Sequence, residues 1–275
     1  TPMKKILIAA AALATVGTSA FAQSSVTIYG RLNLTIERQK PASDESNWVM
    51  QNNPSRWGLK GSEDLGGGLK ASFLLESGFA SDTGAGAGGF GRESWVGLES
   101  ASLGKLRLGN VSSTALYFAT ADYISLHNHD TGSSADAFYL YQGTSTDTVA
   151  YTSPKLGGFV AEAQVGLDDG AGRRTYVLAG NYDAGPLHLG GGYLKGTDSS
   201  GFGDGAKQFG IRALYEFGPM IFGAYYINDK IDAPGNVDLK RNTFRLAAQS
   251  NIGAGELHAN VGIASKLKAS GTTQD

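Results

Sequence analysis

Apolar and polar residues alternate along the chain from Ser25 to Arg38. One side of such an extended segment carries Val26, Ile28, Leu32, Leu34 and Ile36, and the other carries Thr27, Tyr29, Arg31, Asn33, Thr35 and Glu37. Successive side chains of a β-strand point to opposite faces, so this pattern predicts a strand with one dry face and one wet face.

Comparable segments recur almost to the end of the chain, in one domain without an interdomain linker. We expect strands over residues 25–38, 55–65, 69–78, 91–98, 104–110, 146–153, 159–167, 173–183, 187–195, 207–217, 220–228, 239–251 and 256–266. Short connections rich in Gly and Pro, which suit tight reversals, are predicted at 64–68, 153–158, 183–186, 217–219 and 251–255. Longer loops are predicted at 39–54, 79–90, 111–147, 168–172, 196–206, 229–238 and from 267 onward. Short turns on one side and long loops on the other are typical of an outer-membrane barrel, in which lipid covers the dry face and the wet face lines a lumen.

The aromatic residues of the dry face fall into two groups. Near the long loops are Trp57, Tyr193, Phe209 and Tyr226, and next to the short turns are Tyr151, Tyr182 and Tyr215. Two belts of amphipathic rings are expected at the two membrane interfaces. The ordinary preference of aromatic residues for strands is the alternative explanation of any one of them.

The first residues have the three regions of a secretory signal peptide in order. Lys4 and Lys5 are followed by an apolar stretch over 6–16 and by an Ala-x-Ala sequence that ends at Ala22. This predicts cleavage before Gln23, and the apolar stretch is too short for a spanning helix. We therefore divide the chain into residues 1–22, with Thr1 and Pro2 extraneous, and a barrel domain over 23–275.

Composition agrees with export and excludes some chemistry. The chain has 275 residues and no Cys, so disulfides and thiolate metal sites are excluded. The formal charge is −2, and removal of Lys4 and Lys5 changes it to −4. This charge gives no reason to expect nucleic-acid binding, and no cofactor is expected.

Several motifs in order resemble one protein family. They are 25–30 (SVTIYG), 55–79 (SRWGLKGSEDLGGGLKASFLLESGF), 91–98 (GRESWVGL), 104–109 (GKLRLG) and 151–159 (YTSPKLGGF). Together they resemble the general-diffusion porins of Gram-negative bacteria, especially the β-proteobacterial type, over essentially everything after Ala22. The resemblance implies an all-β fold, a transmembrane antiparallel β-barrel of sixteen strands. It also implies an outer-membrane channel for passive diffusion of small hydrophilic solutes and ions.

The same resemblance implies a homotrimer in contact with lipopolysaccharide and outer-membrane lipid. It further implies that the third long loop folds inside the barrel, and the longest loop here, 111–147, is the third. Only about thirteen strands are counted, and the chain ends in polar residues where the family has a strand with a terminal aromatic. We expect roughly three strands to be missing, and we expect the 275-residue chain not to close a stable barrel, because unpaired sheet edges are costly in hydrocarbon.

Charged residues on the wet face predict the chemistry of the lumen. The inward basic residues are Arg31, Arg56, Lys60, Lys70, Arg92, Lys105, Arg107, Arg212, Arg241 and Arg245, and the inward acidic residues are Glu37, Glu76, Glu162 and Glu216. The predicted loops hold Asp44, Glu45, Asp122, Asp130, Asp136, Asp168, Asp169, Asp198, Asp204, Asp229 and Asp232. Basic walls under acidic loops favour anions at the narrow point, and external acids are available to divalent ions and lipopolysaccharide.

The resemblance also implies which residues form the constriction. Arg56 in Ser-Arg-Trp-Gly and Arg92 in Gly-Arg-Glu-Ser match the constriction arginines of the family, and Lys60 is placed with them. An acid of the third loop faces them in the family, and Asp122 is our choice here. A third wall arginine is absent from the matching segment 144–151. The alternative is that these basic side chains only solubilise the wall.

Catalytic and metal sites are weakly indicated. The glycine-rich stretch 84–89 has the letters of a dinucleotide fingerprint but opens no predicted helix. His127 and His129 lack a third ligand, and the inward His188 and His258 are far apart without a surrounding motif. We therefore expect no enzyme and no bound metal. The alternative to a channel is a secreted β-rich adhesin or binding module, which should have comparable loops at both ends of a sandwich.

Overall fold

Antiparallel strands make up nearly all of the described chain. The computed structural model describes residues 25–39, 45–86, 88–112, 145–167, 174–199, 203–233, 237–266 and 268–271. The strands are β1 (Ser25–Arg31), β2 (Leu34–Gln39), β3 (Asn47–Asn52), β4 (Arg56–Gly66), β5 (Leu69–Gly78), β6 (Glu93–Ser100), β7 (Gly104–Val111), β8 (Ser145–Thr152), β9 (Phe159–Gly166), β10 (Arg174–Ala184), β11 (Leu187–Ser199), β12 (Gly203–Phe217), β13 (Met220–Ala233), β14 (Val237–Ile252), β15 (Gly255–Ala264) and β16 (Lys268–Gly271). Within these ranges no helix is long and apolar enough to span a membrane.

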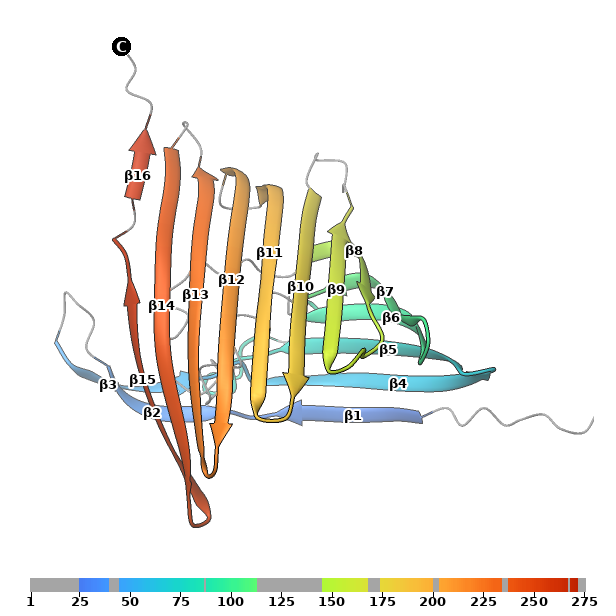
Figure 1. Ribbon diagram of the computed structural model, residues 1–275, viewed down its shortest axis with the longest axis horizontal. Coiled ribbons are helices and arrows are strands. Elements are labelled where there is room, and N and C mark those ends of the chain that lie inside the picture. The colour runs from blue at the N-terminus through green and yellow to red at the C-terminus, as the bar shows by residue number, and fades with distance from the viewer. Residues whose placement is uncertain are drawn as a thin grey trace, which may run out of the picture.

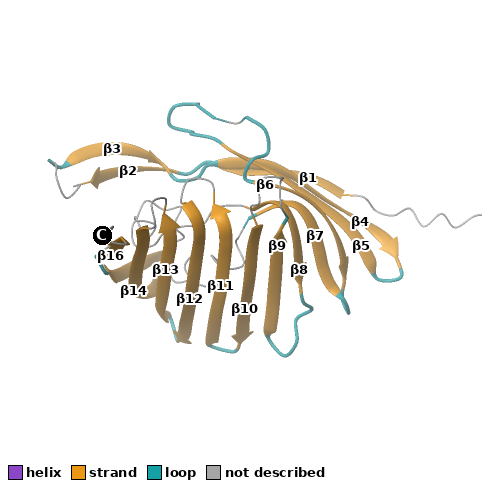
Figure 2. Ribbon diagram, turned by 90° about the horizontal axis from the view of Figure 1, so that it is seen from above, coloured by secondary structure: helices purple, strands orange, loops and turns teal. Residues whose placement is uncertain are grey.

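Thirteen strands form one continuous antiparallel path. Its order is β1-β4-β5-β6-β7-β8-β9-β10-β11-β12-β13-β14-β15, and β16 pairs with β14. The sheet curves strongly, so that β1 to β5 run across the direction of β10 to β14 (Figure 1), and from above it follows most of a circle (Figure 2). Among the described strands, β1 and β15 are not paired with each other. The thirteen strands predicted from the alternation are all present.

One predicted strand and one predicted loop differ from the structure near the N-terminal end of the sheet. The strand expected over 25–38 is divided at Leu32 and Asn33 into β1 and β2. The loop expected over 39–54 contains β3, which pairs with β2 as a separate two-stranded sheet. The apolar run in this segment is only Trp48-Val-Met50, so its strand depends on pairing with β2 and not on a pattern of its own.

The loops expected over 196–206 and 229–238 are also wrong, because the strands beside them continue. β11 reaches Ser199 and pairs with β12 from Gly203 onward, and β13 pairs with β14 up to the Ala233 and Val237 pair. Gly, Thr and Asp in these segments favour turns. Hydrogen bonds between paired strands join backbone groups and do not depend on the side chain, so pairing with a neighbouring strand overrides this weak preference.

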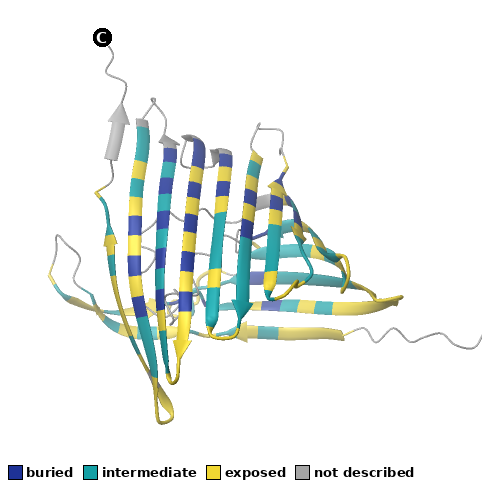
Figure 3. Cartoon of the chain, viewed as in Figure 1, coloured by how far each residue is buried: buried dark blue, intermediate teal, exposed yellow. Residues whose placement is uncertain are grey.

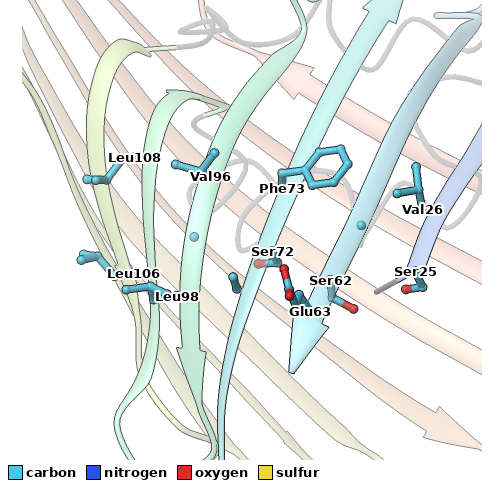
Figure 4. A pocket seen from close by; sticks show the side chains of 13 residues that line it. Ser25, Val26, Ser62, Glu63, Ser72, Phe73, Val96, Leu98, Leu106 and Leu108 are labelled. Carbon is cyan, nitrogen blue, oxygen red and sulfur yellow. The ribbon is translucent and has the colours of Figure 1, made fainter. Parts of the chain in front are cut away.

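The convex outer face of the sheet is apolar, with aromatic residues toward both ends. Exposed side chains on it include Val26, Ile28, Val96, Leu98, Leu106, Leu178, Leu246 and Val261. Of the predicted belts, Trp57, Tyr193, Phe209, Tyr151 and Tyr215 are exposed, and Tyr226 and Tyr182 are partly exposed. The outer face of β1 and β4 to β7 has an open hollow of about 560 Å³ lined by side chains such as Phe73, Val96 and Leu108 (Figure 4). An apolar wall with belts of this kind suits contact with lipid.

The inner face is less polar than the alternation predicted. On β10 to β13, where buried residues alternate along the strands (Figure 3), it carries the buried apolar residues Val177, Leu194, Leu214, Tyr225, Ile227 and Ile231. The expectation that the inner face is polar is therefore wrong at these positions. The outer faces of these strands are apolar as well. Around Val177 the sequence of β10 is therefore a continuous apolar run, and alternation alone does not show which residues face inward and which face outward.

Gly58 allows an aromatic side chain of β1 to cross the neighbouring strand. A Cβ at this position would lie 2.9 Å from the Tyr29 ring and 2.5 Å from the carbonyl oxygen of Leu75. We expect Gly58→Ala to displace the ring and to lower the free energy of unfolding by about 1–3 kcal/mol. Urea titration of the refolded protein in vesicles measures this, and Gly88→Ala, at an open loop position, is the matched control.

Candidate channel lining

Two arginines and a tyrosine converge on the carboxylate of Glu76 at the inner face. Arg92 donates from Nε to Oε1 over 2.7 Å, and the Tyr29 hydroxyl donates to Oε2 over 2.8 Å. Arg56 Nε lies 3.6 Å from the same Oε2. The Glu76 side chain is only 12% exposed. One carboxylate is therefore shared by two guanidinium groups, and the two arginines with Glu76 carry one net positive charge.

Strand register brings these residues together from distant parts of the chain. Arg56 opens β4 and pairs with Gly78, the last residue of β5, while Gly58 pairs with Glu76. Gly78 leaves the space that the Arg92 side chain occupies, since a Cβ there would lie 3.0 Å from Arg92 Cδ. The cluster is thus built by β1, β4, β5 and the residue before β6.

Lys60 and Arg31 extend this basic region along the inner face. Lys60 Nζ lies 5.2 Å from the centre of the Tyr29 ring, which is within the range of a cation–π contact. Arg31 is the register partner of Arg56. Arg31, Arg56, Lys60 and Arg92 are therefore gathered in one sector of the wall.

A second network lies further along the wall. Arg107 of β7 pairs with Glu162 of β9 over 2.8 Å. The same carboxylate accepts hydrogen bonds from Thr152 at 2.9 Å and from Gln164 at 2.6 Å. Gln164 also donates to the backbone oxygen of Ser112 at 3.2 Å. Because Gln164 is buried on the inner face, Ser112, the residue after β7, lies on the inner side of the wall.

Lys105 stands beside an aromatic side chain of the inner face. Its Nζ is 4.6 Å from the centre of the Trp95 ring and 3.7 Å from a carboxylate oxygen of Glu99. Lys70, the other predicted lining lysine of this part of the wall, lies beside the β4–β5 turn opposite Asp64. These lysines therefore lie nearer the short-turn end than the Glu76 cluster.

The predicted lining arginines of β12 and β14 contact polar side chains of the same inner face. Arg212 donates to Asn181 over 2.7 Å, and Arg245 donates to Asn260. Arg241 is the register partner of the buried Asp229. Arg212 thus reaches across β11 to Asn181 of β10, whereas Asn260 belongs to β15, the strand beside that of Arg245.

His188 lies between two carboxylates close to the short turns. Its Nδ1 is 2.8 Å from Asp183 and its Nε2 is 3.1 Å from Glu216. Glu216 is thus on the inner face as expected, and Glu37 belongs to the β2–β3 hairpin, where it accepts a hydrogen bond from Gln39.

Some predicted residues are not covered. Asp122, His127 and His129 lie outside the described residues, as does the predicted signal peptide. Sequence reasoning placed Glu76 and Glu162 on the inner face but missed their role as shared acceptors. The alternation of side chains along each strand puts Tyr29 and Glu76 on the same face. It does not show which arginine forms an ion pair with each acidic residue.

Known proteins share both the sequence and the fold. The family model described as Gram-negative porin matches residues 9–275. "Outer membrane porin protein 32" of Delftia acidovorans is 32% identical, over 91% of this chain and 77% of the relative. An outer membrane porin protein of Bordetella pertussis is 37% identical, over 57% of this chain and 46% of the relative.

Solved structures resemble the fold at lower sequence identity. The "Anion-selective porin from Comamonas acidovorans" superposes with a TM-score of 0.71 at 24% identity, covering 90% of this chain and 80% of that one. The trimer form of the Vibrio cholerae outer-membrane protein OmpT superposes with a TM-score of 0.62 at 18% identity, over 90% and 80% of the two chains.

Proposed function

The chain belongs to the Gram-negative porin family of outer-membrane channels, and from this premise we propose that it passes small hydrophilic solutes with a preference for anions. The observation that carries the preference is the inner-face sector in which Arg56 and Arg92 share the carboxylate of Glu76, with Lys60 over the neighbouring Tyr29 ring. A net positive wall lowers the energy of an anion in a narrow passage. The anion selectivity named for the similar Comamonas porin supports this proposal.

We propose that Arg56, Lys60 and Arg92 form one wall of the narrowest part, with Asp122 opposite. Asp122 belongs to the segment between β7 and β8, and the position of Ser112 on the inner side of the wall supports an approach of this segment to the lumen. The remaining lining would come from Arg31, Lys70, Lys105, Arg107, Arg212, Arg241 and Arg245.

We further propose a homotrimer in contact with outer-membrane lipid and lipopolysaccharide, without a catalytic role. The trimer form of the similar OmpT structure supports the assembly, and the apolar outer face supports the contact with lipid. No described feature favours the alternative of a secreted adhesin.

Single-channel recording tests the channel. The refolded full-length mature protein in planar bilayers is expected to give stepwise, ohmic conductance, and its reversal potential in a salt gradient is expected to have the sign of anion preference. Protein that inserts without forming a conducting path, or a pore that prefers cations, would contradict the proposal.

A further inference from the structure

Four lysines form a row across the outer face of β11 to β14. Lys195 is the register partner of Lys207, Lys207 of Lys230, and Lys230 of Lys240. These four strands lie side by side (Figure 1). The register puts the row close to the strand ends at Ser199 and Ala233, where the sequence predicts the longer loops. Adjacent strands are about 4.8 Å apart, so the row extends over about 14 Å.

The row faces outward. The chain neighbours Leu194, Gln208 and Asp229 are buried on the inner face, and strand alternation turns each lysine to the opposite side. Lys195 and Lys207 are exposed, and the Lys240 side chain is 52% exposed.

Layers of side chains place the row at the level of lipid headgroups. Tyr193 and Phe209, two residues from the lysines of β11 and β12, form a directly opposed outward pair. On β13 and β14 a layer of polar side chains lies between the Tyr226 ring and the lysines. In this layer the Asn228 side chain donates a hydrogen bond to Asn242 Oδ1 at 2.6 Å, and the Tyr226 hydroxyl donates to the same oxygen at 3.0 Å. Aromatic belts mark the boundary of the hydrocarbon, so cations just beyond them lie among headgroups.

The charges of the row are only partly balanced. Asp238 lies 3.2 Å from Lys230 and 3.6 Å from Lys240, so two lysines share one carboxylate. Lys195 and Lys207 form no ion pair with any residue that the structure describes. Like charges directly opposite each other across strands are destabilising, so a bound anion would relieve the row.

We propose that Lys195, Lys207, Lys230 and Lys240 bind the phosphate groups of lipopolysaccharide in the outer leaflet. The assignment rests on the proposed function, which puts the long-loop side at the cell exterior. Each ammonium group has three donors, and a linear row suits a glycolipid with several phosphates better than a lipid with one. Its acyl chains would lie on the apolar outer face below the aromatic layer.

The test is titration of the refolded pore in detergent with lipopolysaccharide, with the bound lipid counted by native mass spectrometry. Each lysine near a membrane surface contributes about 1 kcal/mol to the attraction of anionic lipid. We therefore expect Lys195→Gln/Lys207→Gln to bind about 30-fold more weakly, because tenfold corresponds to about 1.4 kcal/mol. Lys195→Arg/Lys207→Arg, which keeps both charges, should bind like the parent, and Lys155→Gln, at an exposed position of the short-turn side, should have no effect.

Thermal stability gives a second readout, in which the double Gln substitution is not expected to destabilise the lipid-free protein. Without lipid, the double Gln variant should be at least as stable as the parent, since a repulsion is removed. With lipopolysaccharide, the parent should gain more stability than the variant. Unchanged affinity in the double Gln variant, or equal affinity of the parent for dephosphorylated lipopolysaccharide or for phosphatidylglycerol, would overturn the assignment. Single-channel conductance of the same preparations shows separately whether the channel itself exists.

Discussion

Replacing Arg56 and Arg92 together by Gln is expected to remove most of the anion preference of the pore. In the parent, Arg56, Lys60 and Arg92 stand against Glu76, and these four groups together carry two net positive charges. A unit charge about 10 Å from a passing ion contributes about 0.4 kcal/mol in water-like surroundings, so two give about 0.8 kcal/mol, roughly a fourfold preference before salt screening. In the double variant the charges of Lys60 and Glu76 cancel, so these four positions no longer favour an anion, and Arg31 is the basic neighbour that remains.

Glu76→Gln is the matched variant, and it is expected to change the anion preference in the opposite direction. It leaves three net positive charges among these four positions and is expected to raise the preference to about eightfold by the same Coulomb estimate. Reversal potentials in a potassium chloride gradient measure both effects, and Lys155→Gln controls for a change in total charge. Retention of the parent preference by Arg56→Gln/Arg92→Gln would show that these arginines are not at the narrow point.

The strand pattern is predictable because lipid imposes it. Every strand that faces hydrocarbon needs apolar residues at alternate positions, as Val26 and Ile28 in β1 illustrate. The same requirement does not act on segments outside the lipid. For this reason the sequence predicts loops at β3 and at the far ends of β11 and β13, where strand pairing is not accompanied by an alternating apolar pattern.

The alternation of side chains predicts which charged residues lie on the inner face, but it does not predict which residues they contact. The hydrogen bond between Tyr29 and Glu76 joins residues 47 positions apart, and it depends on the register of β1, β4 and β5. The lysine row depends on register across four strands. A slip by one residue would turn Lys207 to the other face, and the sequence alone does not fix that register.

Replacing Glu162 by Ala is expected to lower the free energy of unfolding by about 3 kcal/mol, because Arg107 would remain buried without its carboxylate. The Arg107 side chain is 11% exposed and the Glu162 side chain 16% exposed. Thr152 and Gln164 would also lose an acceptor for their hydrogen bonds. The midpoint of urea unfolding in vesicles, followed by the shift between folded and unfolded gel migration, measures the change.

An exposed ion pair of the same wall provides the comparison. Glu99, whose side chain is 50% exposed, lies 3.7 Å from Lys105. Glu99→Ala should therefore cost less than about 1 kcal/mol, the range of solvent-screened pairs. Removing both buried partners in Arg107→Met/Glu162→Met should recover a large part of the stability that Glu162→Ala loses, because no uncompensated charge is then left in the wall. If Glu162→Ala costs no more than Glu99→Ala, the ion pair with Arg107 does not hold β7 to β9 together.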